Sequence, residues 1–185
     1  MILIIGLGNP GEDYDQTRHN IGFVILDKFS EETGILAQIS KFNSILIKSE
    51  YAGKALICVK PYTFMNNSGS AVLKVIKHFE DKIESTIVIH DDLDVEFGEI
   101  KFKSGGGTGG HNGLESIVKK LGHSDFDRLR FGIGRPPGRK DPADFVLSGF
   151  KMKETRELDS IISISTEALK DYVENGINFA MNKYN

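Results

Sequence analysis

Hydrophobic residues recur along this chain with two different periods, and the shorter period predicts strands. Met1 to Ile5 is an apolar run that stops at Gly6, and such β-branched runs are typical of buried strands. Two further segments flank Ala52-Gly53 in the manner of a β-hairpin. The strands predicted in this way are 1–5, 44–51, 54–60, 86–90, 99–103 and 128–133.

The longer period predicts helices, because apolar residues three or four positions apart share one helical face. The helices predicted in this way are 21–32, 68–79, 112–121 and 158–173. Asn20 is the expected N-cap of the first helix, because asparagine is a favoured capping residue. Asn175-Gly176 is expected to close the last and longest one.

Strands that alternate with helices predict an α/β fold, here one domain over residues 1–185. We expect a three-layer sandwich with helices on both faces of a twisted sheet. The hairpin makes that sheet mixed, although mostly parallel. Asn9, Asn66 and His90-Asp91 each stand at the end of a predicted strand, so they should gather at the edge where α/β sheets bind ligands.

Charge changes this picture only locally. The formal net charge of −3 predicts no anionic partner for the whole molecule. Residues 80–96 are acidic, however, whereas residues 98–140 hold nine basic and four acidic side chains. The second segment predicts a local basic face that could bind phosphate, with an ordinary mixed surface as the alternative.

The chain shows no sign of secretion or membrane insertion. Its one cysteine, Cys58, lies in an apolar run and is expected to be a buried small hydrophobe. It cannot form a disulfide within the chain, which agrees with a reducing compartment. The N-terminus lacks a basic n-region, and no apolar stretch reaches membrane-spanning length. We therefore expect a cytoplasmic location.

The first glycine motif fits the dinucleotide-binding pattern G-x-G-x-x-G but has the wrong surroundings. Pro10 lies inside the motif and has no N–H to offer a phosphate. About ten residues separate the loop from the first helix, whereas the fingerprint requires a helix directly after it. Asp27, the acidic residue at the right distance, lies within that helix. These details argue against a nucleotide cofactor.

Polar residues at turns indicate a neutral hydrogen-bonding pocket with one base. Asn9, Asn66 and Asn112 each lie in a glycine- or turn-rich stretch and suit an uncharged carbonyl or a nucleotide edge. His19 precedes a helix, and a carboxylate such as Asp91 or Asp92 could fix its tautomer and leave its other nitrogen free as a base. No serine or cysteine has a nucleophile setting, so the base would act on water.

Two other arrangements stay open at this level. His90, Asp91, Asp92 and Asp94, with His111, could hold a divalent metal, although their spacing matches no known metal motif. The glycine-dense stretch 104–113 leads into a helix N-terminus, which is a ready anion site, and it could equally be a flexible connector.

Taken together, the motifs resemble bacterial-type peptidyl-tRNA hydrolase over nearly the whole chain and in the right order. Asp92 stands where many members have glutamate, and the adjacent Asp91 is unaffected. The matching stretches are 6–11, Tyr14, 17–22, 60–66, 90–94, 101–103, 105–113, 128–130, 132–136, 144–147 and 180–182.

The resemblance implies a monomeric, cofactor-free and metal-free cytosolic esterase that hydrolyses the ester between a peptide and the 3′ ribose of tRNA and so recycles the tRNA. It needs no membrane and no obligate protein partner. It implies that His19 is the general base, that Asp91 orients it, and that Asn9 senses the blocked peptide nitrogen. Residues implied to line the site for the peptide and the CCA end, or to support it, are Tyr14, Phe64, Met65, Asn66, His111 and Asn112. The tRNA would be bound at its acceptor stem and CCA end, and those residues implied to hold tRNA phosphates are Lys101, Lys103 and Arg130.

Two alternatives remain beside it. One is a catalytically silent RNA-binding protein that uses the same basic face. The other is a metal-dependent phosphoesterase built on residues 90–94.

Overall fold

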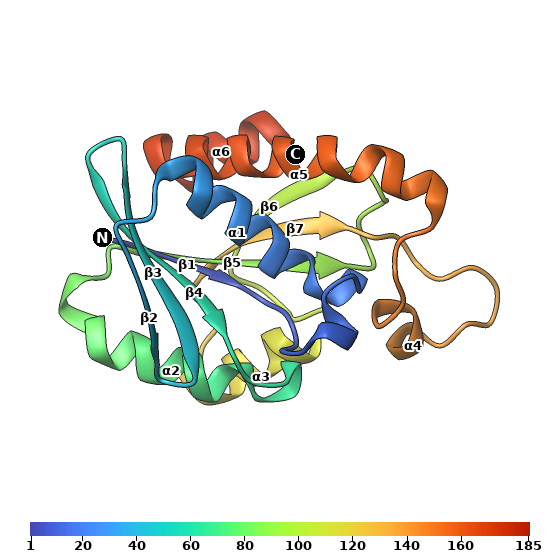
Figure 1. Cartoon of the computed structure of the whole chain (residues 1–185), viewed down its shortest axis with the longest axis horizontal. Helices are drawn as coiled ribbons and strands as arrows, with labels where there is room; N and C mark the ends of the chain where they lie inside the picture. The colour runs from blue at the N-terminus through green and yellow to red at the C-terminus, as the bar shows by residue number, and fades with distance from the viewer.

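The computed structural model describes residues 1–185 and contains one seven-stranded sheet between two helical layers (Figure 1). The strand order is β2-β3-β4-β1-β5-β7-β6, and β3 and β6 run against the other five strands. The strands are β1 (Ile2–Gly6), β2 (Ala37–Lys41), β3 (Ser44–Tyr51), β4 (Lys54–Pro61), β5 (Ser85–Asp92), β6 (Ile100–Ser104) and β7 (Asp127–Gly132). The predicted mixed, mostly parallel sheet is thus confirmed.

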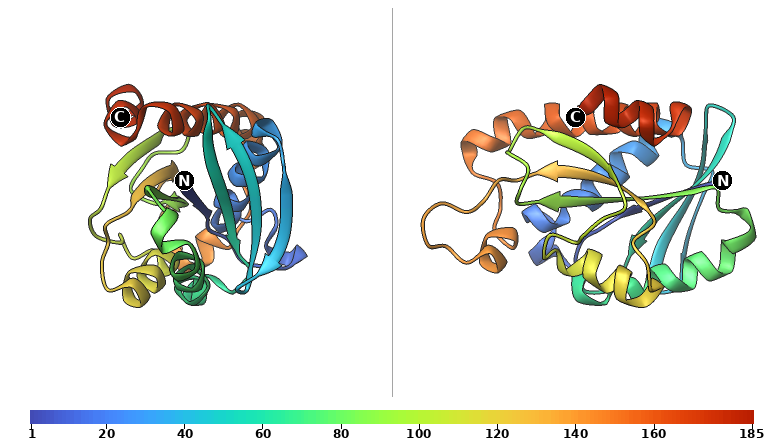
Figure 2. Two further views of the ribbon diagram at one scale, coloured as in Figure 1. Left: turned by 90° about the vertical axis from the view of Figure 1, so that its left-hand side faces the viewer. Right: turned by 180° about the vertical axis from the view of Figure 1, so that it is seen from behind.

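Helices cover both faces of the sheet, as predicted (Figures 1 and 2). One layer consists of α1 (Ile21–Thr33), α5 (Met152–Asn175) and α6 (Ile177–Tyr184), and the other of α2 (Ser68–Phe79) and α3 (Asn112–Leu121). Each layer buries its own hydrophobic cluster against the sheet. The short α4 (Pro142–Val146) lies apart from both layers, beyond the tips of β5 and β7 (Figure 1). None of the helices has both the length and the apolar character that crossing a membrane requires.

The structure adds elements that the sequence pattern did not predict. β2 is an edge strand with every residue exposed, so it carries no alternation of buried and exposed positions. α5 begins at Met152, six residues before the predicted start at Leu158, because its first turns face solvent and lack an apolar period. Gly176 ends α5 with a φ of 82° and leads directly into α6.

Close backbone approach brings the start of α1 onto the sheet edge. A Cβ on Gly22 would lie 2.5 Å from the Ile89 carbonyl oxygen and 2.6 Å from the Leu7 nitrogen, so only glycine fits there. The 3₁₀ turn η2 (Arg18–Asn20) immediately precedes this contact. His19 is therefore held over the carboxyl ends of β1 and β5. The other 3₁₀ turns are η1 (Glu12–Tyr14), η3 (Met65–Asn67) and η4 (Glu80–Lys82).

Candidate active site

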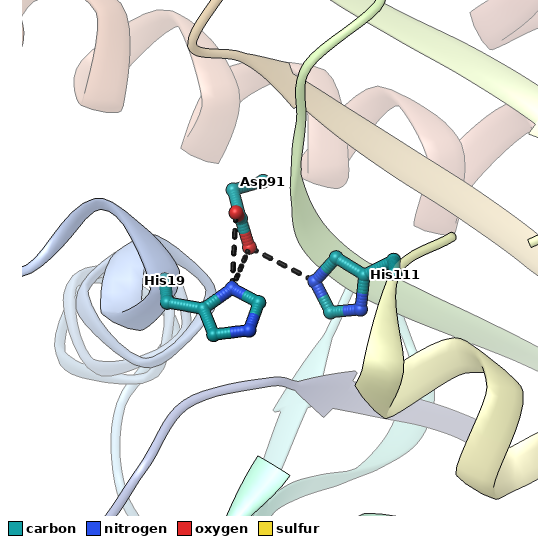
Figure 3. Close-up of side chains that lie close together, drawn as sticks. All are labelled: His19, Asp91 and His111. Atoms are coloured by element: carbon teal, nitrogen blue, oxygen red, sulfur yellow. Dashed lines mark hydrogen bonds and ion pairs between the residues drawn. The ribbon is translucent and has the colours of Figure 1, made fainter. Parts of the chain in front are cut away.

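His19 and Asp91 form a buried pair at the end of β5 (Figure 3). The His19 Nδ1 atom lies 2.8 and 3.0 Å from the two carboxylate oxygens of Asp91. An ionised carboxylate can only accept, so Nδ1 carries a proton, and in the neutral imidazole Nε2 keeps its lone pair. His19 makes no hydrogen bond through Nε2, and it lines two neighbouring cavities. The structure thus brings together the two residues that the sequence paired.

His111 donates a second hydrogen bond to Asp91, and its surroundings fix its tautomer. Its Nδ1 accepts from the backbone amides of Gly113 and Leu114, at 3.1 and 3.3 Å, and so caps α3. Because an amide N–H can only donate, Nδ1 must be unprotonated and Nε2 must carry the proton. Nε2 lies 2.9 Å from Asp91 Oδ1. Both nitrogens of His111 are therefore engaged within the protein, and its polar atoms support Asp91.

Electrostatics keep Asp91 ionised and its neighbour His90 neutral. Burial alone would raise the pKa of Asp91, but the two imidazoles of His19 and His111 outweigh it and hold that pKa well below its usual range. Burial, and then the proximity of His111, lower the pKa of His90 to about 3. His90 donates its Nδ1 proton to the Asp91 carbonyl oxygen at 2.7 Å, because a carbonyl oxygen can only accept. In the neutral imidazole Nε2 is then unprotonated, and it has no hydrogen-bond partner.

Asn9 is fixed by a reciprocal contact with Asn20. The Asn9 amide donates to Asn20 Oδ1, and Asn20 Nδ2 donates to the Asn9 carbonyl oxygen, both at 2.8 Å. The Asn9 side-chain oxygen accepts from the Met65 amide at 2.7 Å. Asn9 Nδ2 is consequently the donor left free where this residue lines a cavity. Asn20 stands at the N-cap position of α1, as predicted, but its side chain makes no capping bond. It instead satisfies the peptide groups of the loop.

Two cavities meet at His19. The first, of about 290 Å³, lies between the glycine-rich loop, Asp91 and α4. The second, of about 240 Å³, lies between the Asn9 loop, η3 and α4. The residues that line both are His19, Asn112, Ala143 and Val146.

Most of the residues expected to bind substrate surround the second cavity. Those found there are Asn9, Tyr14, Phe64, Met65, Asn66 and Asn112. The ring of Tyr14 meets that of Phe64 edge-on, with centroids 6.1 Å apart, and Phe64 is 57% exposed. An aromatic pair beside the buried Asn9 and the exposed Asn66 and Asn112 suits a ligand that is partly apolar and partly hydrogen-bonding.

The three predicted phosphate ligands project from one face of the β6–β7 edge. Lys101 lies opposite Arg130 in the antiparallel register of the two strands. Arg130 donates through Nε to Asp92 at 2.7 Å, and the Lys101 ammonium lies 3.5 Å from Glu99. Lys103 is exposed and makes no ion pair within the protein. Of the three cations, Lys103 has the least compensated charge.

Arg128, which the sequence analysis did not single out, fastens the glycine-rich loop. Its side chain is buried, and its guanidinium donates to the carbonyl oxygens of Gly107 and Gly106 at 2.5 and 2.6 Å. This loop leads directly to His111 and Asn112. The glycine-dense stretch is therefore held in place by Arg128 of β7 and is more than a flexible connector.

The acidic cluster at 90–94 does not converge on one point. Asp91 faces two imidazoles, Asp92 binds Arg130, and Asp94 binds Arg135. The remaining metal-compatible group is His19, Asp91 and His111, whose candidate ligand atoms lie within 4.8 Å of one another. The Nε2 of His111 carries a proton when Nδ1 caps α3, so this trio fits a hydrogen-bonded relay better than a metal cage.

Comparison with known proteins gives one consistent result. The family model described as peptidyl-tRNA hydrolase matches residues 3–185. A peptidyl-tRNA hydrolase of Mycobacterium tuberculosis is 45% identical over 183 residues, which cover 98% of this chain and 96% of that protein. One from Syntrophotalea carbinolica is 42% identical over 185 residues, covering 100% of this chain and 97% of that one. The crystal structure of peptidyl-tRNA hydrolase from Acinetobacter baumannii superposes with a TM-score of 0.91 at 37% identity, covering 100% and 94% of the two chains.

Proposed function

The chain belongs to the peptidyl-tRNA hydrolase family and is an enzyme that hydrolyses peptidyl-tRNA, and we propose that His19 is the base that activates the attacking water. The observation that carries this assignment is the free Nε2 of His19 at the junction of two cavities, with Nδ1 bonded to ionised Asp91. A lone pair in such a position can take a proton from water within hydrogen-bond reach.

In the proposed reaction His19 takes one proton from water and later gives it to the ribose oxygen that leaves. As water attacks the ester carbonyl carbon, His19 Nε2 takes its proton and the carbonyl oxygen becomes an oxyanion. Asp91 stabilises the imidazolium that forms, because the pair then carries opposite charges at 2.8 Å. When the intermediate collapses, the bond between the carbonyl carbon and the ribose oxygen breaks. The imidazolium returns its proton to that oxygen, so tRNA leaves with a free hydroxyl and the peptide with a free carboxyl group.

Asn9 supports selectivity for a blocked amino group. Its Oδ1 is committed to the Met65 amide, so only the donor Nδ2 faces the cavity. The carbonyl oxygen of an N-acyl group can accept from this donor. The ammonium of an ordinary aminoacyl-tRNA has no lone pair to offer, so it would face another donor. This arrangement favours peptidyl-tRNA over aminoacyl-tRNA.

The other substrate groups follow from the lining of the site. We assign Tyr14, Phe64, Met65, Asn66 and Asn112 to the peptide and the CCA end, and His111 to the support of Asp91. Lys101, Lys103 and Arg130 would bind phosphates of the acceptor stem, with Lys103 contributing most. We further propose that the enzyme acts as a cytoplasmic monomer without metal or cofactor.

One assay tests the activity, its selectivity and its metal independence together. Purified protein in EDTA is offered an N-acetyl-aminoacyl-tRNA and, separately, the same tRNA with a free amino group. Rapid loss of only the blocked ester is expected. His19→Ala should abolish turnover and retain tRNA binding. An active His19→Ala enzyme would remove His19 as the base, and inhibition by EDTA that added metal reverses would favour the phosphoesterase alternative.

A further inference from the structure

Arg18 is a buried cation next to the proposed base. Its side chain is 1% exposed, and its guanidinium donates to both oxygens of Glu154, at 3.0 and 2.6 Å. The same group lies over the rings of Phe145 and Phe150, 4.3 and 4.8 Å from their centroids. Burying a guanidinium is costly unless it is paired, so these contacts restrict how the two segments can pack. We call the contacts of Arg18 with Glu154, Phe145 and Phe150 the joint.

The partners of Arg18 belong to a segment more than 120 residues away in the chain. Phe145 is in α4, and Glu154 is in the first turn of α5. The Glu154 carboxylate also accepts from the Lys151 amide at 2.6 Å, which ties the start of α5 to the same point. The Arg18 amide donates to the Ser148 carbonyl oxygen at 3.0 Å. The connection from α4 to α5 is therefore fastened at the turn that carries His19.

This fastened segment forms a wall of both cavities. Ala143 and Val146 line the two of them, and Leu147 lines the second. Phe145 is the only residue of α4 that is buried, and Arg18 stacks on its ring. Phe145 also belongs to the larger hydrophobic cluster, and Val146 packs against that cluster. These contacts hold α4 although it lies apart from both helical layers (Figure 1).

We propose that Arg18 is a positioning residue that holds α4 over His19 through its ion pair with Glu154 and its contact with Phe145. Arg18 lines neither cavity, so it acts on the substrate only through α4 and through the turn that bears His19. Because it directly precedes His19, one side chain sets both the turn that bears the base and the wall opposite it. The inference rests on the proposed role of these cavities in binding peptidyl-tRNA.

Glu154→Gln removes the charge in α5 that pairs with Arg18, and it changes no residue of the turn that bears His19. The glutamine oxygen can still accept from the Lys151 amide, but the charge that pairs with Arg18 is gone. The KM for N-acetyl-aminoacyl-tRNA should rise about tenfold with kcat within about twofold of the wild type, as expected for lost uniform binding. Amide hydrogen exchange at residues 143–149 should accelerate, and exchange in the sheet should not.

Glu157→Gln is the matched control, because Glu157 is exposed on the same helix and makes no ion pair. Arg18→Lys keeps the charge and loses the planar fork, so it should give a smaller change of the same kind. Phe145→Leu keeps an apolar anchor and should also raise KM.

The proposal is overturned if Glu154→Gln matches Glu157→Gln in KM and in exchange. It is equally overturned if Glu154→Gln only lowers the melting temperature and the active fraction at unchanged KM. Should the wild type fail to cleave the substrate, the proposed function fails, and the exchange data still report on the joint by themselves.

Discussion

His111→Asn separates the two tasks of one imidazole. In the wild type, Nδ1 caps α3 and the protonated Nε2 donates to Asp91 at 2.9 Å. Asparagine is a good N-cap, and its side-chain oxygen can take the place of Nδ1. It has no atom that reaches the position of Nε2. The substitution should therefore keep the helix cap and remove one of the two donors to a carboxylate that is 2% exposed.

Two effects on His19 oppose each other in this variant. Without His111, the carboxylate of Asp91 becomes more basic, which by itself would strengthen its pull on the His19 proton. Loss of the His111 side chain also frees Asp91 to rotate. It removes the imidazole ring that packs on His19, since the two ring centroids lie 4.8 Å apart. Water from the adjoining cavity can then solvate and screen the pair. We expect the misorientation of Asp91 to be the larger of the two effects. Since a hydrogen bond to a charged group is worth about 1.5–3 kcal/mol, kcat should fall roughly 10- to 100-fold.

Single-turnover hydrolysis of N-acetyl-aminoacyl-tRNA measures the loss, and thermal unfolding measures the cap. His111→Asn should melt close to the wild type. His111→Ala loses the cap as well, which costs about 1 kcal/mol and should lower Tm by about 2–4 °C in a chain of this size. A His111→Asn enzyme that is folded like the wild type and equally fast or faster would refute the view that His111 orients Asp91.

Three other expectations concern stability, selectivity and tRNA contact. The pKa of His90 is about 3 in the folded chain, against an ordinary value of 6.5, so the unfolded chain takes up its proton first and stability falls as pH drops from about 6.5 towards 3. This group alone should cost about 2 kcal/mol at pH 5, and His90→Asn should flatten the pH dependence of urea unfolding; parallel curves would contradict it. Asn9→Asp exchanges the free donor for an acceptor, so cleavage of N-acetyl-aminoacyl-tRNA should fall about 100-fold while discrimination against the free amino group narrows. Lys103→Ala should weaken tRNA binding and lower its salt slope by about one, and an unchanged slope would remove Lys103 from the phosphate site.

The sequence predicted the parts of this molecule that depend on local pattern. Apolar runs located the central strands, and turn residues placed Asn9 and Asp91 at strand ends on one sheet edge. The choice of Asp91 over Asp92 as the partner of His19 came from the family resemblance, since the strand-end pattern alone left both carboxylates open. β2 and α4 were not predicted from the sequence, for a related reason. An exposed edge strand and a helix of five residues that covers a cavity bury too little to show a period.

Contacts between residues far apart in the sequence were also not predicted. Asn20 was expected to cap the helix that follows it, since capping is a local preference, yet its partner is the backbone of Asn9, eleven residues upstream. No role was predicted for Arg18, because nothing in its neighbourhood reveals a partner 136 residues away. Buried polar groups of this kind are specified by the folded environment, and a single sequence does not display that environment.

The hydrogen-bond network of the site ends in two free atoms of opposite character. The proton on His111 Nε2 and the proton on His19 Nδ1 both point at Asp91, so the lone pair of His19 Nε2 is turned outward. On the Asn9 side, Oδ1 is occupied by the Met65 amide, so the donor Nδ2 is turned outward. Both His19 and Asn9 line the second cavity. Water needs an acceptor to become a nucleophile, and the carbonyl of an N-acylated substrate needs a donor to be held beside it. A variant that reverses either atom should therefore damage one requirement and spare the other: His19 changes should act on kcat, and Asn9 changes should act on the choice between blocked and free amino groups.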